Sequence, residues 1–306
     1  MEKRCIICDG RKNKKLYKLN GYSILKCSSC HFIFTYPLPT NAELQKLYNK
    51  FTYEEGFANE KLIRRDAKRI LSNIKKIKHK KGTLLDMGAG AGFLLDEARK
   101  QGWKTQGIEI APIPLAHAEK KLKLKITRKG ILDFETNNKF DTIILSQVIE
   151  HFADPRPVLI KISKLLKNDG IACISTPNIT SFLARVLGKD FNYLSPPNHL
   201  LYFSPATLTK FIENSGFKLV KIHSYGYPED AGIAYRAIKV KRTKQNSVNI
   251  SDINPNVKNF ISKKQKPRLT QKVRKYLFEN VFRELAYRVL NVRMNGSMIE
   301  AYIQKR

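Results

Sequence analysis

The chain has 306 residues, 42% of them hydrophobic, which suits one large folded domain plus a small module and excludes a wholly disordered chain. No stretch approaches the roughly 20 apolar residues needed to span a bilayer, and Met1 to Gly10 lacks the apolar core of a secretory signal, so we expect a cytoplasmic protein. The formal charge of +31 fits a polyanionic partner, but it equally fits a general bias toward Lys, which lies along nearly every segment.

Residues 1–40 contain two Cys-x-x-Cys pairs, which we interpret as a zinc-ribbon-like module. The pairs are Cys5 with Cys8 and Cys27 with Cys30, and 18 residues separate them. Two such pairs can place four thiolates tetrahedrally around zinc, and the metal can supply the folding energy that so short a segment lacks. Two disulfides and a redox-active pair are the alternatives. A cytosolic location disfavours disulfides, and neither pair begins a helix as a redox pair would.

Residues 41–80 are expected to be a helical connector and cofactor lid, with one helix from Asn41 to Tyr48 and another over 59–78. From residue 82 onward, apolar strands alternate with helices. The expected strands are 83–87, 105–110, 124–127, 140–146, 171–175 and 217–223, and the expected helices are 93–100, one from 112, 155–166, 178–187 and 205–216. Such alternation is typical of a parallel sheet covered by helices on both faces.

The first turn of this pattern carries three alternate glycines directly after a strand that ends in an acidic residue. The strand delivers Asp86 to the edge of the sheet, and Gly88, Gly90 and Gly92 let the backbone approach a ligand closely. Glu109 ends the next strand, where a carboxylate can accept hydrogen bonds from both hydroxyls of a ribose.

Such a glycine loop alone would also suit a dinucleotide, but its spacing departs from G-x-G-x-x-G. A carboxylate at Asp86 suits the cationic amino-acid part of S-adenosylmethionine and is poorly placed beside a pyrophosphate. The plainer alternative is that Asp86 caps a helix and that Glu109 is an exposed strand end.

Together these segments resemble class I S-adenosylmethionine-dependent methyltransferases. The glycine loop resembles their first motif, Gly107 to Ala111 the second, Leu132-Asp133-Phe134 the segment after the third strand, and Phe140 to Pro155 the fourth-strand motif. The resemblance covers 82–225 and 297–305 and implies an α/β, Rossmann-like sheet of seven strands whose last strand is antiparallel. It also implies that S-adenosylmethionine binds at Asp86, Gly88, Gly90, Gly92, Glu109, Asp133 and Gln147. An ordinary turn aspartate is the alternative for Asp133.

A four-cysteine module before such a domain resembles a branch of small-molecule methyltransferases associated with sugar and polysaccharide synthesis. His151 and His199 are candidate bases for an alcohol acceptor, and each could instead be structural. The Asn/Asp-Pro-Pro-Tyr signature of amino-group methylation is missing after the fourth strand, and no cysteine is placed for attack on a pyrimidine. These absences favour a small-molecule or glycan acceptor such as a sugar, a sugar nucleotide or a lipid-linked saccharide. The alternatives are an RNA methyltransferase that uses the zinc module and the basic surface to bind the RNA backbone, and a binding protein without turnover.

The predicted organisation is a module over 1–40, the connector over 41–80, the methyltransferase core over 81–227, a basic insertion over 228–270, and a helix and last strand over 271–306. Residues 228–267 are polar and basic and are expected to form a mobile insertion. The helix expected over 271–289 has an apolar face flanked by Arg and Lys. It could pack on the sheet, or approach an anionic membrane face and make the protein peripheral to the membrane.

Overall fold

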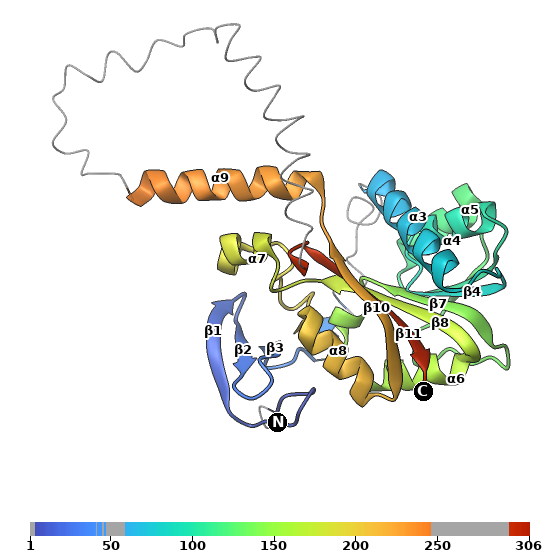
Figure 1. Cartoon of the computed structure of the whole chain (residues 1–306), viewed down its shortest axis with the longest axis horizontal. Helices are drawn as coiled ribbons and strands as arrows, with labels where there is room; N and C mark the ends of the chain where they lie inside the picture. The colour runs from blue at the N-terminus through green and yellow to red at the C-terminus, as the bar shows by residue number, and fades with distance from the viewer. Residues whose placement is uncertain (1–3, 41, 45, 47–58, 246–293) are drawn as a thin grey trace, which may run out of the picture. The chain divides into compact units, whose positions relative to one another are not determined.

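The computed structural model describes residues 4–40, 42–44, 46, 59–245 and 294–306 (Figure 1). The described residues fall into two compact units. The first combines the described parts of Met1–Ile179 with Asn192–His223 and Met298–Arg306, and the second combines Thr180–Phe191 with the described parts of Ser224–Ser297.

Within the described residues, seven strands form one sheet in the order β10-β11-β8-β7-β4-β5-β6. The strands are β4 (Thr83–Met87), β5 (Lys104–Glu109), β6 (Ile126–Arg128), β7 (Phe140–Ser146), β8 (Leu166–Pro177), β10 (Phe217–Tyr225) and β11 (Met298–Lys305). Strands β4 to β8 pair in parallel, whereas β11 runs antiparallel to β8, with Met298 opposite Pro177. This confirms the Rossmann-like sheet and its antiparallel last strand.

Both faces of this sheet are buried, as its apolar strands predict. Leu85 and Met87 point into one hydrophobic cluster, and Leu84 points into the other. The first cluster includes residues of α6 (Arg156–Leu165) and α8 (Pro205–Asn214), and the second includes residues of α3 (Glu60–Ile77), α4 (Phe93–Lys100) and α5 (Pro112–Leu122). Figure 1 shows these two groups of helices on opposite faces of the sheet. The parallel strands therefore end at one common edge, where connecting loops can hold a ligand.

Two helices begin close to where the sequence predicts. The long helix expected over 59–78 is α3, which is joined to α4 by bonds from the Arg64 guanidinium to Asp96 (2.7 Å) and Glu97 (2.8 Å). Helix α8 begins with a capping box in which Ser204 and Thr207 exchange hydrogen bonds. Of the helix expected over 41–48, residues 42–44 and 46 are helical, and the other half lies outside the described residues.

The N-terminal segment forms a second sheet with a strand from the methyltransferase-like region. Four strands of the described chain make it up, namely β1 (Asn13–Leu19), β2 (Tyr22–Cys27), β3 (Ile33–Tyr36) and β9 (Leu201–Tyr202), in that order. Asn20 and Gly21 both have positive φ, as a two-residue hairpin turn requires. Phe32 packs on Phe203 with ring centroids 5.1 Å apart. The module therefore shares its hydrophobic core with the larger sheet.

The second unit corrects two expectations. The helix expected over 178–187 begins later, as α7 (Phe182–Leu187), because Ser181 caps it through its hydroxyl. Residues 228–245 were expected within a mobile insertion, but they form helix α9 (Pro228–Gln245). Proline suits the first helical turn, the Asp230 carboxylate accepts a bond from the Tyr227 amide (2.9 Å), and many of the residues that follow are good helix formers. The rest of the predicted insertion and the helix expected over 271–289 lie outside the described residues.

The remaining elements are the short 3-10 helices η1 (Ile149–His151) and η2 (Gly188–Asp190). None of the helices in the described part of the chain combines the length and the apolar composition that crossing a bilayer requires.

Candidate functional site

The three glycines after β4 have different local reasons to be glycine. All three have positive φ, at 87° for Gly88, 51° for Gly90 and 80° for Gly92. A Cβ atom on Gly88 would lie 2.6 Å from Val148, and one on Gly92 would lie 2.8 Å from Leu124. A Cβ on Gly90 would meet nothing within 4 Å. The loop is therefore packed at its two ends and open at its centre, where a ligand can approach the backbone.

Asp86 precedes this loop as a buried carboxylate at the end of β4. The residue is only 3% exposed. Burial, together with the nearby charge of Glu109, raises its pKa to about 7. A buried carboxylate is stabilised in its charged form by a cationic partner, and the ammonium group of a ligand at the open loop would provide one.

Glu109 links the glycine loop to the next strand and helix. Its Oε2 accepts a hydrogen bond from the Gly90 amide (2.8 Å), and its Oε1 accepts bonds from the amides of Ile110 and Ala111 (2.7 Å each). The carboxylate therefore holds the loop and the start of α5, a structural task that the sequence did not predict. Two carboxylate oxygens offer about four acceptor positions, so at least one remains for a ligand hydroxyl.

Asp133 lies in an exposed turn whose amide donates to the Gly130 carbonyl (3.1 Å). Two apolar side chains near this edge were not singled out from the sequence. Ile110 is 48% exposed and Leu132 is 41% exposed, each next to one of the predicted acidic ligands. An exposed apolar residue directly beside a predicted acidic binding residue is the signal that could have identified them, because an apolar ligand ring needs such a surface.

Gln147 follows β7 in a backbone conformation unusual for a residue with a side chain. Its φ is 57°, its amide donates to the Ser175 carbonyl (2.8 Å), and its side-chain amide donates to the Ser175 hydroxyl (3.1 Å). Strained conformations of this kind are concentrated at functional sites. The next residue, Val148, packs against Gly88, so this turn lies beside the glycine loop.

The two histidines named from the sequence lie together, although 47 residues separate them along the chain. Their ring centroids are 4.8 Å apart and their planes meet edge to face. Nδ1 of His151 bonds to the Asn198 carbonyl (2.7 Å), and Nδ1 of His199 bonds to the Tyr193 carbonyl (2.8 Å). Burial lowers the pKa of His151 and, together with the neighbouring ring, lowers the pKa of His199 to about 3. Both rings are therefore neutral at pH 7.

Glu150 is the third member of this cluster, and the sequence assigned it no role of its own. It is 0% exposed. Its Oε2 accepts a bond from the Thr176 hydroxyl (3.1 Å), whereas its Oε1 has no hydrogen-bond partner among the described residues. Burial raises its pKa to about 8.

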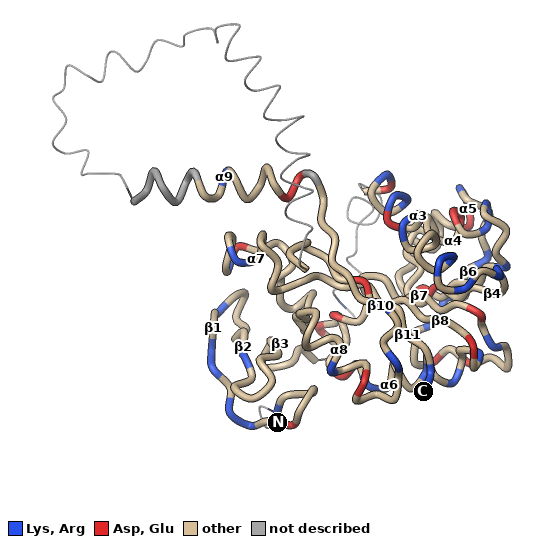
Figure 2. Tube along the Cα trace, in the orientation of Figure 1, with Lys and Arg blue, Asp and Glu red and all other residues tan. Residues whose placement is uncertain are grey.

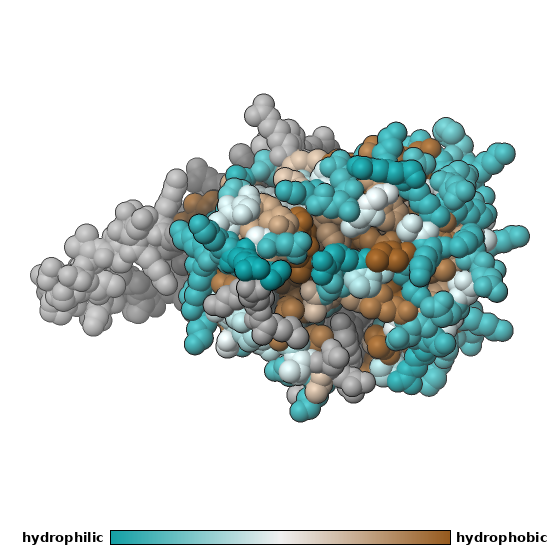
Figure 3. Space-filling view, turned by 90° about the horizontal axis from the view of Figure 1, so that it is seen from below, coloured by the Kyte–Doolittle hydropathy of each residue, from teal (hydrophilic) through white to brown (hydrophobic). Residues whose placement is uncertain are grey.

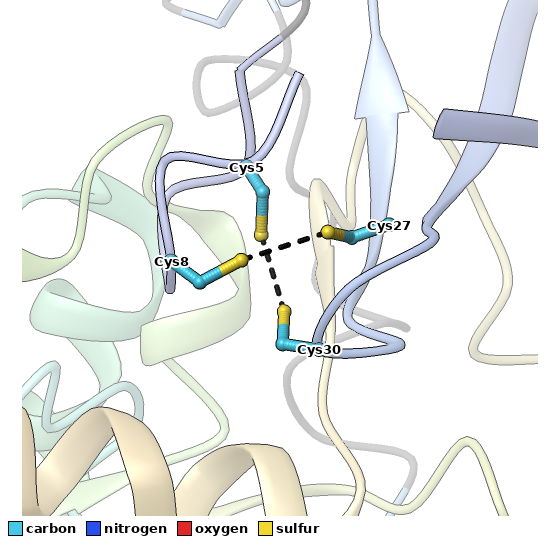
Figure 4. Close-up of side chains that lie close together, drawn as sticks. All are labelled: Cys5, Cys8, Cys27 and Cys30. Carbon is cyan, nitrogen blue, oxygen red and sulfur yellow. Dashed lines mark hydrogen bonds between the residues drawn. The ribbon is translucent and has the colours of Figure 1, made fainter. Parts of the chain in front are cut away.

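The four predicted cysteine ligands meet at one point, as Figure 4 shows. The Sγ atoms of Cys5 and Cys30 are 3.4 Å apart, and those of Cys8 and Cys27 are 3.6 Å apart. Four sulfurs at 2.3 Å from one zinc ion would be about 3.8 Å apart, whereas a disulfide bond is about 2.05 Å long. The donor set and its spacing fit tetrahedral zinc.

The surroundings of the thiols support the same fit. A Cβ atom on Gly10 would lie 3.2 Å from the Cys27 sulfur and 3.3 Å from the Cys8 sulfur, so a glycine leaves room for the cluster. Burial raises the pKa of the Cys27 thiol, but backbone hydrogen bonds from Cys30 and Ser29 outweigh this and bring it to about 7. Amide donors of this kind favour a thiolate at Cys27, the form that binds metal, whereas burial raises the pKa of Cys5 and raises that of Cys30 to about 11.

Comparison with known proteins identifies the family. A family model described as a methyltransferase domain matches residues 59–222, which is more than half of the chain. A ubiquinone biosynthesis O-methyltransferase of Actinobacillus pleuropneumoniae is 27% identical over 161 residues, covering 47% of this chain and 69% of that protein. The corresponding protein of Dinoroseobacter shibae is 30% identical over 150 residues, covering 45% of this chain and 60% of that protein.

A solved structure shows the same fold. The crystal structure of a SAM-dependent methyltransferase from Archaeoglobus fulgidus superposes with a TM-score of 0.51 at 20% identity. The superposition covers 84% of this chain and 99% of that one.

Proposed function

The chain belongs to the methyltransferase-domain family, and we propose that it transfers a methyl group from S-adenosylmethionine to an oxygen of a small-molecule or glycan acceptor. The main support for the acceptor site is the neutral His151–His199 pair. His151 comes shortly after β7, which pairs in parallel with β4, so it follows the same end of the sheet as the glycine loop. At this edge, the residues around β4 and β5 would bind the cofactor, and the histidine pair would bind the acceptor.

The residues around β4 and β5 suit the cofactor. Asp86 would pair with its ammonium group, the open face of Gly90 would admit it, and Glu109 would accept from a ribose hydroxyl. Asp133 and Gln147 remain proposed contacts at the rim, and the exposed side chains of Ile110 and Leu132 would offer apolar surface to the adenine ring. When bound, S-adenosylmethionine would supply a methyl group on a sulfonium that is electrophilic enough for direct transfer.

The histidine pair would bind the acceptor hydroxyl and take its proton. Because Nδ1 of each neutral ring donates to a carbonyl, the lone pair of each ring lies on Nε2. Such a nitrogen can accept a hydrogen bond from an alcohol and take its proton as the oxygen attacks. We assign His151 the role of base because it follows the turn that packs on Gly88, and we assign His199 the role of orienting the hydroxyl.

The cysteine module would support this site through its sheet. The four thiolates would hold one zinc ion, which fixes β2 and the start of β3. The Thr35 amide donates to the Leu200 carbonyl (2.8 Å), and the Thr35 hydroxyl donates to the His199 carbonyl (3.2 Å). Zinc would therefore have a structural role that reaches the acceptor site through β3.

The acceptor class rests on two further observations. The curated relatives named above are O-methyltransferases of a small molecule by name. Lys and Arg occur on β1, on α3 and around the sheet in Figure 2 and do not gather on one element, and the face shown in Figure 3 is largely hydrophilic with scattered apolar areas. A charge spread in this way favours general amino-acid bias over a dedicated RNA groove.

Methyl transfer from labelled S-adenosylmethionine to phenols, sugar nucleotides, lipid-linked saccharides and RNA tests the proposal. We expect label in a small molecule or glycan, and we expect His151→Gln to lower the rate by about 100-fold or more. His79→Gln removes an exposed histidine and is the matched control, with an unchanged rate. Label in RNA alone, or an unaffected His151→Gln variant, would contradict the proposal.

A further inference from the structure

A second set of potential metal ligands lies apart from the cysteines. Glu150, His151 and His199 each offer one ligand atom, and these three atoms lie within 4.8 Å of one another. Two ligands that are about 2.1 Å from one ion are separated by at most roughly 4.2 Å. Three ligands around one ion lie closer, at most about 3.6 Å from one another when evenly spaced, so side-chain shifts of up to about 0.7 Å would bring all three onto one cation.

Both histidines are already oriented as metal ligands usually are. A ligating histidine commonly donates its other ring nitrogen to a backbone carbonyl or a carboxylate, which fixes the tautomer and the ring plane. His151 and His199 each make such a bond through Nδ1, to Asn198 and to Tyr193. In a neutral ring this leaves Nε2 with the lone pair that a cation needs.

Glu150 supplies an independent observation. Its Oε1 is fully buried without a hydrogen-bond donor among the described residues, although a buried oxygen left unpaired costs about 1–3 kcal/mol, and more if charged. The Thr176 hydroxyl satisfies only the other oxygen. The Leu200 amide also donates to the Glu150 carbonyl (2.8 Å), which ties the His199 loop to η1. A cation would satisfy the unpaired oxygen within a frame that backbone bonds already hold.

We propose that Glu150, His151 and His199 bind one divalent cation of the first transition series through two nitrogens and one oxygen. Three protein ligands leave coordination positions open, as in catalytic metal sites. The inference rests on the proposed function in one respect, because an acceptor oxygen is the ligand we place in an open position. The lone pairs that bind the cation are those assigned above to the acceptor hydroxyl, so the base role of His151 applies to the metal-free protein. In the metal-loaded protein the cation would instead hold the acceptor oxygen and acidify its hydroxyl, whose proton would pass to solvent.

Manganese binding to the full-length, zinc-loaded protein tests the site directly. Mn²⁺ prefers oxygen and nitrogen donors over thiolates, so the cysteine cluster does not compete for it. The free ion is counted by its electron paramagnetic resonance signal. We expect one Mn²⁺ per chain, and at least tenfold weaker binding in Glu150→Gln and His199→Gln. His79→Gln should bind as the unaltered protein does.

Two further measurements keep the test decisive. Glu150→Gln keeps the acceptor for the Thr176 hydroxyl, and S-adenosylmethionine binding by calorimetry shows that each variant is folded. If Glu150→Gln does not fold, His199→Gln carries the test. The site would be overturned if the zinc-loaded protein bound neither Mn²⁺ nor Co²⁺, or if binding survived both substitutions. Metal binding is read without an acceptor, so failure to methylate any small molecule would contradict the proposed function and leave the site standing.

Discussion

The affinity for S-adenosylmethionine should fall steeply in mild acid because of Asp86. The pKa of this buried carboxyl is raised to about 7, so about half of the molecules carry the charged form at pH 7. Only that form pairs with the ammonium group of the ligand. At pH 5.5 about 3% of the carboxyls remain charged, so the affinity should drop about fifteenfold between pH 7 and pH 5.5.

Isothermal titration calorimetry measures this linkage in two ways. The affinity is followed from pH 5.5 to pH 7, and the heat at pH 7 is compared in two buffers of different ionisation enthalpy. About half a proton should be released per ligand bound at pH 7, because binding converts the protonated carboxyls to the charged form.

Asp86→Asn should bind at least tenfold more weakly at pH 7, a loss of about 1.4 kcal/mol or more, and should show no pH dependence in this range. The exposed Asp133 provides a matched control, since Asp133→Asn should keep the slope. An affinity that stays flat from pH 5.5 to pH 7 in the unaltered protein would refute the pairing.

Four other expectations follow from the structure and the sequence. The protein should carry about one zinc per chain, lost in Cys30→Ser, and elemental analysis without zinc together with disulfides by mass spectrometry would contradict this. Gly88→Ala should unfold at lower temperature than the unaltered protein because its Cβ would meet Val148, whereas Gly90→Ala should fold and bind the cofactor at least tenfold more weakly. Equal melting temperatures of Gly88→Ala and the unaltered protein would contradict the packing argument. Glu150→Gln should stabilise the metal-free protein at pH 9 but not at pH 4. The pKa of Glu150 is higher in the folded than in the unfolded state, so ionisation of this carboxyl destabilises the fold as the pH rises, and the full penalty is reached above about pH 8. Equal denaturant midpoints of the variant and the unaltered protein at both pH values would refute this. Deletion of 258–268 should abolish sedimentation with anionic vesicles at low salt if that segment meets a membrane, and equal indifference to anionic and neutral vesicles would reject the membrane surface.

Several features of this protein could be predicted from local sequence. The run from Phe140 to Ser146 is apolar throughout, and a strand with no polar face must be buried on both sides, which is why the doubly covered sheet was predictable. The glycine loop was predictable because positive φ at neighbouring positions requires glycine. The cysteine site was predictable because metal ligation constrains the spacing within each pair.

Helix α9 shows where local patterns were not enough. Its apolar residues do not gather on one face, so periodicity gave no signal for a helix, although Pro228 and Asp230 suit a helix start. Propensity and the first turn decided the outcome, and both are weak indications when no apolar stripe accompanies them.

The acceptor side of the site was decided by tertiary structure alone. His151 and His199 were each named from the sequence, but only the packing of the His199 loop against η1 places their rings 4.8 Å apart. The unpaired oxygen of Glu150 and the bonds from Thr35 to the His199 loop likewise join segments that are far apart in the chain. Backbone conformation and metal-ligand spacing are set within a few residues, whereas contacts between distant loops depend on how whole elements pack, and no local pattern encodes them.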